Sequence, residues 1–498
     1  MINLITYFYR YTKLVYNIYN YVENYHKNNS HNILLLDHLI ENIKSCGSVC
    51  IKLCQWSTPK LEIMHLDNND ILDDHKPLWL NKLENFYENC NDHDLYHTFK
   101  LYERDFGESL NDNYEILDTI GSGSIGQVYL LKEKTLTKYQ QPNKYVMKIL
   151  HPKVKNDIYY FRMYYNFIRC FPFIKKLLDT QFPFDINSFL DSFDEQSDFI
   201  NESNNLLRFQ ENYRHNDYII IPRLIKCSKN IMIMSYEEGV SYDNLKCDNY
   251  HKYKIAVLLT SFIRNNQQIC NYQHGDLHKG NWKVKLCEDN KHKIILYDFG
   301  FCWKVPLTKQ DKINESINIF EDCDPGAEGG GEGEDEDDVI DYERMTNVLL
   351  YLLKYDEKDK DKYYDIIYKY VRDNTHLIKP WAFNPSRVVK TTVKLCIETG
   401  LKIDPILLQG VIIVIQCQKI FQEFRFISSD DKDDFVTSQE VYRVKYMDWL
   451  SFYKTYDIFP EFSNYIQDSL NDLQSEIKEV FECNDIPDSF KSLALKHK

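Results

Sequence analysis

The sequence predicts an α+β protein of two lobes, one built around a five-stranded sheet and the other helical. Two observations predict this layout. Strand-like segments gather in the middle of the chain, while the segments before and after them follow a helical period. At 498 residues the chain can also bury more than one core. We expect a helical extension at 1–112, a sheet lobe at 113–238 and a helical lobe at 239–498.

The extension at 1–112 is predicted to be mostly helical. Helical periodicity runs through 31–55 and again through 84–105, and Asn- and Asp-rich stretches near 66–76 and 90–94 predict loops. Six apolar residues also repeat at helical spacing near the N-terminus: Leu4, Phe8, Tyr11, Val15, Ile18 and Val22. We expect this stripe to pack on the rest of the protein rather than on a membrane interface.

The sheet lobe contains five predicted strands. Alternating or apolar segments predict them at 114–120, 127–131, 144–150, 218–221 and 231–236. The polar stretch 133–143 predicts a hairpin loop between the second and third strands. The segment 158–213, between the third and fourth, is predicted to be helical.

The helical lobe begins beyond residue 242, with short strands predicted only at 282–286 and 293–297. An acidic, glycine-rich stretch at about 321–341 cannot bury apolar surface and predicts a disordered insertion. This stretch carries much of the net charge of −15, so the rest of the chain is only mildly acidic. Binding to nucleic acid is therefore not expected.

Cysteine spacing and hydropathy give no sign of disulfide pairs, a transmembrane segment or secretion. The 14 cysteines show no paired spacing, and Cys46, Cys50 and Cys54 are expected to be small buried residues in an intracellular, reducing compartment. No stretch is apolar for 18 residues, and the N-terminus has no signal-peptide pattern. We expect neither a transmembrane segment nor a secretory signal, and the compartment itself is not predicted.

A glycine-rich loop joins the first two strands. Gly121, Gly123 and Gly126 spell G-x-G-x-x-G, and glycines let backbone N–H groups approach phosphate oxygens. A dinucleotide site would place this motif before a helix, and an ATPase P-loop would need a lysine after it. The expected phosphate-binding residues are Gly121, Ser122, Gly123, Ser124, Ile125, Gly126, Gln127 and Val128, and Glu237, after the fifth strand, completes the nucleotide-binding set.

Further along the chain, five residues complete a site for ATP and Mg²⁺. Lys148 lies in the third strand, where it can reach phosphates, and Glu202 on the following helical segment is its expected partner. Asp276 and Asn281, five residues apart in His-Gly-Asp-Leu-His-Lys-Gly-Asn, have the spacing of a catalytic carboxylate and a metal-binding amide. Asp298, before Phe-Gly, is the second expected Mg²⁺ ligand. His278 is expected to brace its loop.

In this order the motifs resemble those of protein kinases, and residues upstream resemble the ABC1 family of atypical kinases, also called the UbiB or ADCK group. Ile51-Lys-Leu-Cys-Gln-Trp56 is similar to the family's Lys-x-Gly-Gln signature. Ser124-Ile-Gly-Gln-Val-Tyr129, Lys148 with His151-Pro-Lys-Val154, and the segment 196–205 are similar to further family motifs. The resemblance covers roughly 45–305.

This resemblance implies a bilobal kinase-like fold whose helical extension lies over the site, with Lys52 and Gln55 among the catalytic residues. It also implies ATP binding, weak ATPase activity and a link to isoprenoid or quinone lipids at membranes. Three departures matter: Cys54 replaces a glycine, Gln196 replaces a glutamate near Lys52, and the nucleotide loop is glycine-rich rather than alanine-rich. Nucleotide preference could shift as a result.

No Ala-Pro-Glu follows the Asp298-Phe-Gly segment, so efficient protein phosphorylation is not expected. The leading hypothesis is an ATP-dependent kinase or ATPase acting on a small lipid-like substrate, with peripheral membrane contact as a further expectation. A small-molecule phosphotransferase of the aminoglycoside or choline kinase type is one alternative. A nucleotide-gated scaffold with little chemistry is another. Protein partners are not predicted.

Overall fold

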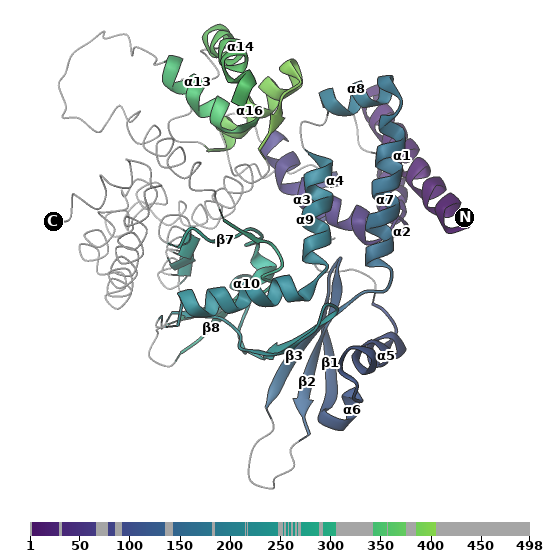
Figure 1. Cartoon of the computed structure of the whole chain (residues 1–498), viewed down its shortest axis with the longest axis vertical. Helices are drawn as coiled ribbons and strands as arrows, with labels where there is room; N and C mark the ends of the chain where they lie inside the picture. Colours follow the sequence, from purple (N-terminus) through teal and green to yellow (C-terminus); the bar gives the residue numbers. More distant parts are fainter. Residues whose placement is uncertain are drawn as a thin grey trace, which may run out of the picture.

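A computed structural model gives the fold of the chain (Figure 1). The described residues are 2–28, 32–65, 78–84, 92–134, 143–181, 185–214, 216, 218–247, 252, 255–256, 258–259, 262–263, 266, 270–287, 292–304, 342–355, 357–374 and 385–404. The predicted insertion at 321–341 lies outside them, as do the loop predicted at 66–76 and the segment beyond 404.

The central sheet has five antiparallel strands in the order β1-β2-β3-β6-β5. They are β1 (Tyr114–Ser122), β2 (Gly126–Glu133), β3 (Lys144–Leu150), β5 (Leu224–Cys227) and β6 (Ile231–Ser235). Lys148 lies in the middle strand, opposite Val128 on β2 and Met232 on β6. A five-stranded sheet was predicted, and four of its strands lie where the sequence placed them.

The predicted strand at 218–221 forms but does not belong to the central sheet. The segment predicted at 218–221 forms β4 (Ile219–Ile220), which pairs in parallel with β9 (Lys293–Leu296) in a separate sheet with β8 (Trp282–Lys285). The continuous isoleucine run suits this more buried position. The fifth strand of the central sheet is β5, an edge strand whose four residues are all half-buried, so its pattern is weak.

The two faces of the central sheet pack against different helices. Alternate residues of β2, β3 and β6, including Tyr129, Met147 and Ile233, pack against α5 (Leu95–Phe106) and α6 (Leu110–Asn113). The opposite face carries Lys148 toward α10 (Phe199–Asn212). Figure 1 shows α5 and α6 on one side of the sheet and α10 on the other. The period of two along the strands thus separates a dry core from the face that carries the site.

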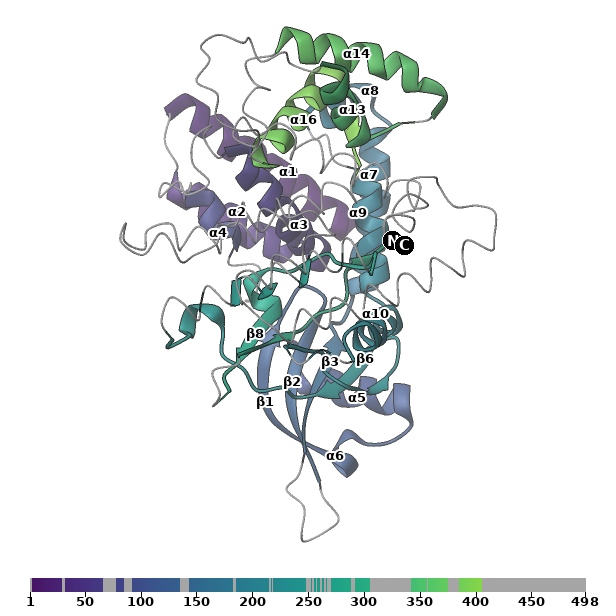
Figure 2. The ribbon, with the colours of Figure 1, turned by 90° about the vertical axis from the view of Figure 1, so that its left-hand side faces the viewer.

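A helical layer lies beside one end of the sheet (Figure 2). It contains α1 (Ile2–Asn28), α2 (Ile33–Ser45), α3 (Ser48–His65), α4 (Leu78–Glu84), α7 (Val154–Arg169), α8 (Pro172–Gln181) and α9 (Ile186–Gln196). The start of α3 is fixed by the buried Asp157 on α7, whose carboxylate accepts hydrogen bonds from Ser48 N at 2.9 Å and Tyr7 Oη at 2.7 Å. Gly47, at φ +90°, leaves room for this carboxylate, because a Cβ there would lie 2.4 Å from Asp157 Oδ2.

The apolar stripe of α1 is divided. Its first half packs as predicted, with Tyr11 buried against α7 and Phe8 half-buried beside it. In its second half, Val15, Ile18 and Val22 are exposed. Of the cysteines expected to be buried, Cys46 and Cys50 are in the core, and Cys54 is half-buried against it.

The remaining described elements belong to the C-terminal part of the chain. They are η1 (Tyr242–Asn244), β7 (Gln273–His274), η2 (Lys279–Asn281), β10 (Cys302–Trp303), α13 (Tyr342–Tyr351), β11 (Leu353–Lys354), η3 (Glu357–Asp359), α14 (Lys360–Asp373), α16 (Pro385–Thr399) and β12 (Lys402–Ile403). Helices α13, α14 and α16 enclose a core of their own. Within the described ranges, no helix combines the length and the apolar character needed to cross a membrane.

Candidate active site

The centre of the site is a buried ion pair between β3 and α10. Lys148 Nζ lies 2.8 Å from both carboxylate oxygens of Glu202, a side chain only 1% exposed. Lys148 shares its face of β3 with Val146 and Leu150, which pack into the main core. The pair predicted from the sequence therefore forms. Because both side chains are buried, their charged groups are held in one position.

Asp298 completes a charged network with this pair. Its Oδ1 lies 3.2 Å from Lys148 Nζ and accepts a hydrogen bond from Gly300 N at 3.1 Å. The residue has φ +53°, a left-handed conformation that Asp tolerates better than most residues. Its side chain is 43% exposed. The carboxylate can thus hold Lys148 and still present an oxygen to the open side of the site.

Burial and mutual charge set the protonation of these groups. Burial raises the pKa of Glu202 to about 7, against the opposing attraction of Lys148. Burial also lowers the pKa of Lys148, but the carboxylates of Asp298 and Glu202 outweigh it and raise that pKa above the ordinary value. For Asp298, burial opposes ionisation, yet Lys148 and Lys52 bring its pKa well below the ordinary range. Lys148 and Asp298 are therefore charged at neutral pH.

The loop 274–281 holds Asp276 and Asn281 together. Asn281 Nδ2 donates to the carbonyl of Asp276 at 2.7 Å, which leaves the Asn281 amide oxygen as its ligand atom. His278 Nδ1 accepts from Gly280 N at 3.1 Å, so the expected bracing bond is present. His274 is buried, which lowers its pKa, and its Nε2 lies 3.2 Å from the carbonyl of Tyr297. The loop is thus tied to the residue that precedes Asp298.

Helix α3 places one predicted residue against this loop and another against the glycine loop. Lys52 Nζ lies 3.5 Å from Asp276 Oδ2, and Gln55 Oε1 accepts from Ser124 Oγ of the glycine loop at 3.0 Å. The amide that stands where a carboxylate was expected, Gln196, instead bonds to Ser192 Oγ at 3.1 Å. Near it, Asp198 is the N-cap residue of α10, and its carboxylate accepts a hydrogen bond from Ile200 N at 3.1 Å.

The three glycines of the loop have different surroundings. No other atom lies within 4 Å of a Cβ built on Gly121, and only Gly126 O, at 3.9 Å, lies near one built on Gly123. A Cβ on Gly126 would lie 2.5 Å from Ile149 O. Gly126 is thus required by the close approach of β2 and β3, whereas the first two glycines line open space where phosphates would lie.

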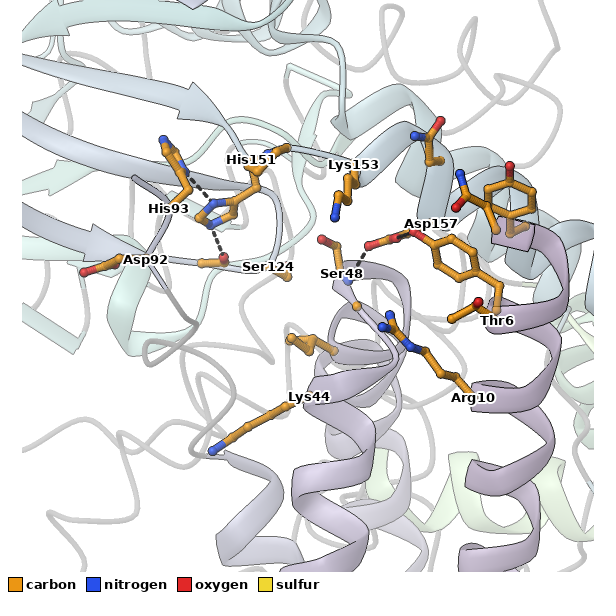
Figure 3. Close-up of a pocket in the computed structure, with 18 of the residues that line it drawn as sticks. Thr6, Arg10, Lys44, Ser48, Asp92, His93, Ser124, His151, Lys153 and Asp157 are labelled. Carbon is orange, nitrogen blue, oxygen red and sulfur yellow. Dashed lines mark hydrogen bonds between the residues drawn. The ribbon is translucent and has the colours of Figure 1, made fainter. Parts of the chain in front are cut away.

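A chain of hydrogen bonds beside the loop was not predicted, although His151 lies in a segment that resembles a family motif (Figure 3). His151 Nε2 lies 3.0 Å from the carbonyl of Gly123, and its Nδ1 lies 2.7 Å from His93 Nδ1. His93 Nε2 lies 3.0 Å from Thr98 Oγ1, which is 2.9 Å from Tyr129 Oη. The segment before α5 is thereby connected to the glycine loop.

The direction of this chain follows from chemistry. A carbonyl only accepts, so His151 carries its proton on Nε2 and accepts at Nδ1 when neutral. His93 then donates from Nδ1 and accepts from Thr98 at Nε2. Burial lowers the pKa of both rings, that of His93 to about 3 with a further contribution from His151. Both histidines are therefore neutral at physiological pH, and every ring nitrogen has a partner.

Tyr297 is a further residue that sequence patterns did not single out, whereas Asn205 belongs to the segment 196–205 that resembles a family motif. Tyr297 Oη donates to the carbonyl of Glu237 at 2.9 Å, and Tyr297 N donates to the carbonyl of Asn281 at 2.8 Å. Asn205 Nδ2 donates to the carbonyl of Phe299 at 2.8 Å. Glu237, predicted to bind nucleotide, accepts from Ser235 Oγ through its carboxylate at 2.9 Å. These bonds join the segment after β6 to the loop that carries Asp298.

The donor set fits Mg²⁺ and a triphosphate. Asp298 and Asn281 supply a carboxylate and an amide oxygen, the ligands that Mg²⁺ prefers. Among the described residues, no three His, Cys, Asp or Glu side chains are arranged to hold a metal by themselves. Such a sparse set suits an ion that takes its other ligands from phosphates and water. The open space beside Gly121 and Gly123 would leave room for the phosphates.

A cavity of about 530 Å³ lies beside the glycine loop but apart from this charged network. It is lined by α1, by Ser48 and Ile51 of α3, and by His93, Ser124 and Asp157, as Figure 3 shows in part. Lys148, Asp276 and Asp298 do not line it. The cavity and the candidate active site therefore lie beside different parts of α3.

Residues 85–324 match the sequence profile of the ABC1 atypical kinase-like domain. The probable serine/threonine-protein kinase abkC of Dictyostelium discoideum is 29% identical over 52% of this chain and 36% of its own. The Arabidopsis thaliana chloroplastic protein ACTIVITY OF BC1 COMPLEX KINASE 1 is 25% identical over 41% of this chain and 30% of its own. The ABC1 family protein MCP2 homolog of Schizosaccharomyces pombe is 22% identical over 49% and 45%. The chain thus spans less than half the length of these relatives.

Solved structures with a partial likeness include Rv3197 of Mycobacterium tuberculosis in complex with erythromycin, at 17% identity and a TM-score of 0.36 over 46% of this chain and 57% of that one. The Rio2 kinase of Chaetomium thermophilum, in an ADP/Mg²⁺-phosphoaspartate complex, gives 12% identity and a TM-score of 0.26 over 68% and 95%. The fold assignment does not depend on these two; it rests on the sheet topology and the profile match. The chain has an α+β, kinase-like fold and belongs to the ABC1 (UbiB/ADCK) family of atypical kinase-like proteins.

Proposed function

We propose that this chain binds Mg-ATP and transfers the terminal phosphoryl group to a small lipid-like acceptor, or to water when no acceptor is bound. The observation that carries the proposal is the fixed position of Lys148. Its ammonium group is held by Glu202 and Asp298 on the face of the sheet that bears the glycine loop. A buried lysine oriented by two carboxylates beside a phosphate cradle is the arrangement that phosphoryl transfer needs.

Each residue then has a defined part in binding. Lys148 neutralises phosphate charge, Glu202 orients Lys148, and the loop amides around Gly121 and Gly123 bind phosphate oxygens. Asp298 and Asn281 would hold Mg²⁺, which neutralises charge on the phosphates when bound. Tyr297 positions both metal ligands, because it directly precedes Asp298 and its amide bonds to Asn281.

Asp276 is the proposed proton acceptor. As the bond between the terminal phosphorus and the ADP oxygen breaks, a bond forms from phosphorus to the acceptor hydroxyl or water oxygen. The proton of that oxygen passes to the Asp276 carboxylate. In the structure this carboxylate faces Lys52 of α3. The helix thus lies where an acceptor would approach, which supports a small acceptor over a folded peptide.

The lipid-like nature of the acceptor is supported by the family to which the chain belongs. None of the site residues named above selects a lipid by itself. The acceptor class is therefore inferred from the family and from the position of Lys52 and Gln55 over the site. A water acceptor needs no further group, and ATPase activity is therefore the first activity to measure.

The test combines nucleotide binding with turnover. Saturating Mg-ATP is expected to raise the melting temperature of the full chain, since a ligand present at about 100 times its Kd stabilises by about 2.7 kcal/mol. Asp298→Asn is expected to lose this shift. Asp276→Asn is expected to keep the shift and lose phosphate release.

The alternatives give different outcomes. Binding without phosphate release from the wild type, with or without lipid, would assign a nucleotide-gated scaffold. Turnover unaffected by Lys52→Ala would favour a small-molecule phosphotransferase of the aminoglycoside or choline kinase type. If Mg-ATP raised the melting temperature of Asp298→Asn as much as that of the wild type, Asp298 would not belong to the nucleotide site.

A further inference from the structure

The cavity of about 530 Å³ beside the glycine loop takes no part in the proposed phosphoryl transfer. It is lined by residues of α1, the end of α2, the start of α3, the segment before α5 and the start of α7 (Figure 3). Binding sites for small molecules commonly have volumes of about 300–1,000 Å³. The cavity is therefore large enough for a small metabolite, and we refer to it as the α1–α7 cavity.

The wall of the α1–α7 cavity is polar. Among the lining residues that the structure describes, Ile51 and Pro152 are the only aliphatic ones. The others include Thr6, Ser48 and Asn156, whose side chains form hydrogen bonds. A lipid chain would cover these polar groups without replacing their hydrogen bonds to water. A ligand of this cavity would therefore differ in class from the lipid-like acceptor proposed above.

Three cations from different elements line the α1–α7 cavity. They are Arg10 of α1, Lys44 at the end of α2 and Lys153 just before α7. Lys44 is paired with Glu41 of its own helix at 3.0 Å. Arg10 and Lys153 form no ion pair with any other residue of the described ranges, and Figure 3 shows their charged ends directed toward the space beside Ser48. Two such cations facing one space favour an anionic ligand.

Lys153 also has an unusual backbone conformation. Its φ of +72° is left-handed, a conformation that Gly and Asn adopt more readily than Lys. Strained residues of this kind gather at ligand-binding sites, where the surrounding structure holds them. The residue is the N-cap of α7, and its side chain lies in the cavity wall. A lysine at this strained position is explained if its ammonium group binds a ligand.

The carboxylates of the wall lie in separate places. Asp157 accepts hydrogen bonds from Ser48 N at 2.9 Å and Tyr7 Oη at 2.7 Å, so its charge is already used within the helical layer. Asp94 caps α5. Asp92 lies on the opposite side of the view in Figure 3, away from the two cations. A ligand with an anionic group at one end and hydroxyl groups at the other would match both ends, since hydroxyls donate to carboxylates.

We propose that the α1–α7 cavity binds a small phosphorylated polyol such as a sugar phosphate. Arg10 and Lys153 would bind the phosphate, and Asp92 would accept hydrogen bonds from the hydroxyl groups. A phosphate monoester carries a charge of about −1.5 to −2 at neutral pH, which matches two cations better than a carboxylate does. Gly123 and Ser124 also line the cavity, so the bound ligand would contact the glycine loop. The proposal does not depend on the proposed nucleotide chemistry.

The test is isothermal titration of the full chain with glucose 6-phosphate and with ribose 5-phosphate, in the absence of nucleotide. At least one of the two is expected to bind, whereas glucose is not. Arg10→Gln with Lys153→Gln is expected to weaken binding at least about a hundredfold, because two charge-assisted bonds are lost. Arg10→Lys with Lys153→Arg keeps both charges and is expected to retain most of the affinity. Lys13→Gln with Lys155→Gln changes exposed cations of α1 and α7 outside the cavity wall, and this matched control is expected to bind as the wild type does.

Asp92→Asn separates the two ends of the ligand. It is expected to weaken binding of the sugar phosphate about tenfold, because the hydroxyl groups lose a charged acceptor. Inorganic phosphate has no such hydroxyl groups, so its binding is not expected to weaken. Asp92 is exposed, and the variant is expected to keep the melting temperature of the wild type. Equal losses for both probes would refute the hydroxyl contact.

Several outcomes would overturn the proposal. Binding of neither sugar phosphate to the wild type would exclude it, as would full binding by Arg10→Gln with Lys153→Gln. Glucose that binds as tightly as glucose 6-phosphate would exclude the phosphate contact. Binding lost in Lys148→Met but kept in the cavity variant would place the sugar phosphate in the nucleotide site. No nucleotide enters these measurements, so failure of the proposed function would leave their results unchanged.

Discussion

The glycine loop lies between two polar networks of opposite construction. On one side, Lys148, Glu202 and Asp298 form a buried network of charges. On the other, His93 and His151 form a chain of neutral hydrogen bonds that ends on the carbonyl of Gly123. The charged network presents groups to a ligand, and the neutral chain holds the loop that would cover it. The comparison assigns the charged network to the proposed chemistry and the neutral bonds to the position of the loop.

The largest expected effect comes from removing the central charge. Lys148→Met is expected to weaken Mg-ATP binding on the order of a hundredfold, because a charge-assisted bond to phosphate is lost. It also leaves Glu202 buried without its cation, which costs on the order of 3 kcal/mol of stability. Isothermal titration with Mg-ATP and chemical unfolding measure the two effects.

Lys144→Met is the matched control for Lys148→Met. Lys144 lies on the same strand but is exposed, with Tyr236 beneath it. We expect near wild-type nucleotide binding from this variant. Equal losses in both variants would show that β3 as a whole, rather than the charged network, governs binding.

A second prediction concerns the pH dependence of Glu202. Its pKa is raised from 4.5 in the unfolded chain to about 7 in the fold, so the folded state retains a proton that the unfolded state has lost. Its contribution to stability is therefore complete below about pH 4.5 and is lost as the pH rises toward 7, by about 3 kcal/mol. Glu202→Gln is expected to remove this slope when unfolding is measured across that range.

Nucleotide binding should respond to Glu202 in the opposite direction. Ionised Glu202 orients Lys148, so Mg-ATP affinity is expected to rise as the pH increases through 7 in the wild type and to lose this dependence in Glu202→Gln. If stability and Mg-ATP affinity changed in the same direction with pH, Glu202 would not have the assigned role of orienting Lys148.

A third prediction separates the glycines at which the two networks meet. Gly126→Ala is expected to destabilise the protein by about 2 kcal/mol, because its Cβ would overlap Ile149 O. Gly121→Ala has space for its methyl group, so it is expected to keep its stability and to lose Mg-ATP affinity. Thermal unfolding with and without nucleotide distinguishes them, and a stable Gly126→Ala protein would refute the strand-contact explanation.

The smallest expected effect belongs to the neutral chain. His93→Asn is expected to cost about 1 kcal/mol by removing the bond to His151. The pKa of His93 is lowered by burial and by His151 and His97 to about 3, from 6.5 in the unfolded chain. Its contribution is thus complete above pH 6.5 and is lost as the pH falls toward 3. Protonation of His93 would also place a donor on its Nε2, the atom that accepts from Thr98 Oγ1 in the neutral ring.

The measurement for His93→Asn is acid unfolding followed from pH 7 downward. The wild type is expected to lose stability more steeply than the variant, the reverse of the Glu202 slope. If Glu202→Gln and His93→Asn changed the dependence of stability on pH in the same direction, the two networks would not be independent.

The sequence predicted the charged network well and the neutral chain not at all. Lys148, Glu202 and Asp298 fall in motifs of fixed order, and the structure brings both carboxylates within 3.2 Å of Lys148 Nζ. His93 and His151 come from segments 58 residues apart with no shared pattern, so only the packing of the segment before α5 on the loop brings them together. The catalytic and metal-binding roles of the site residues remain predictions, as does the division into three parts.

Among the elements of the fold, β5 was missed and β4 was placed in the wrong sheet. Strand partners depend on contacts between distant segments, whereas periodicity reports only local burial. The exposed half of the α1 stripe was likewise expected to pack. Helical spacing identifies an apolar face but does not say how far a neighbouring helix extends along it, and α7 ends at Arg169 while α1 continues.

The packing of α5 and α6 on the sheet has a consequence for synthesis. Leu101 and Leu110 share a core with Ile231 and Ile233, which the ribosome adds about 120 residues later. At usual rates of translation this delay is on the order of ten seconds. During it β2 and β3 are already made, but β6 is missing, so the apolar sides of the two helices are only partly covered. A chaperone that holds residues 95–113 during this interval would protect the nascent chain. A fragment beginning at residue 113 would leave the same sheet face bare and is expected to aggregate.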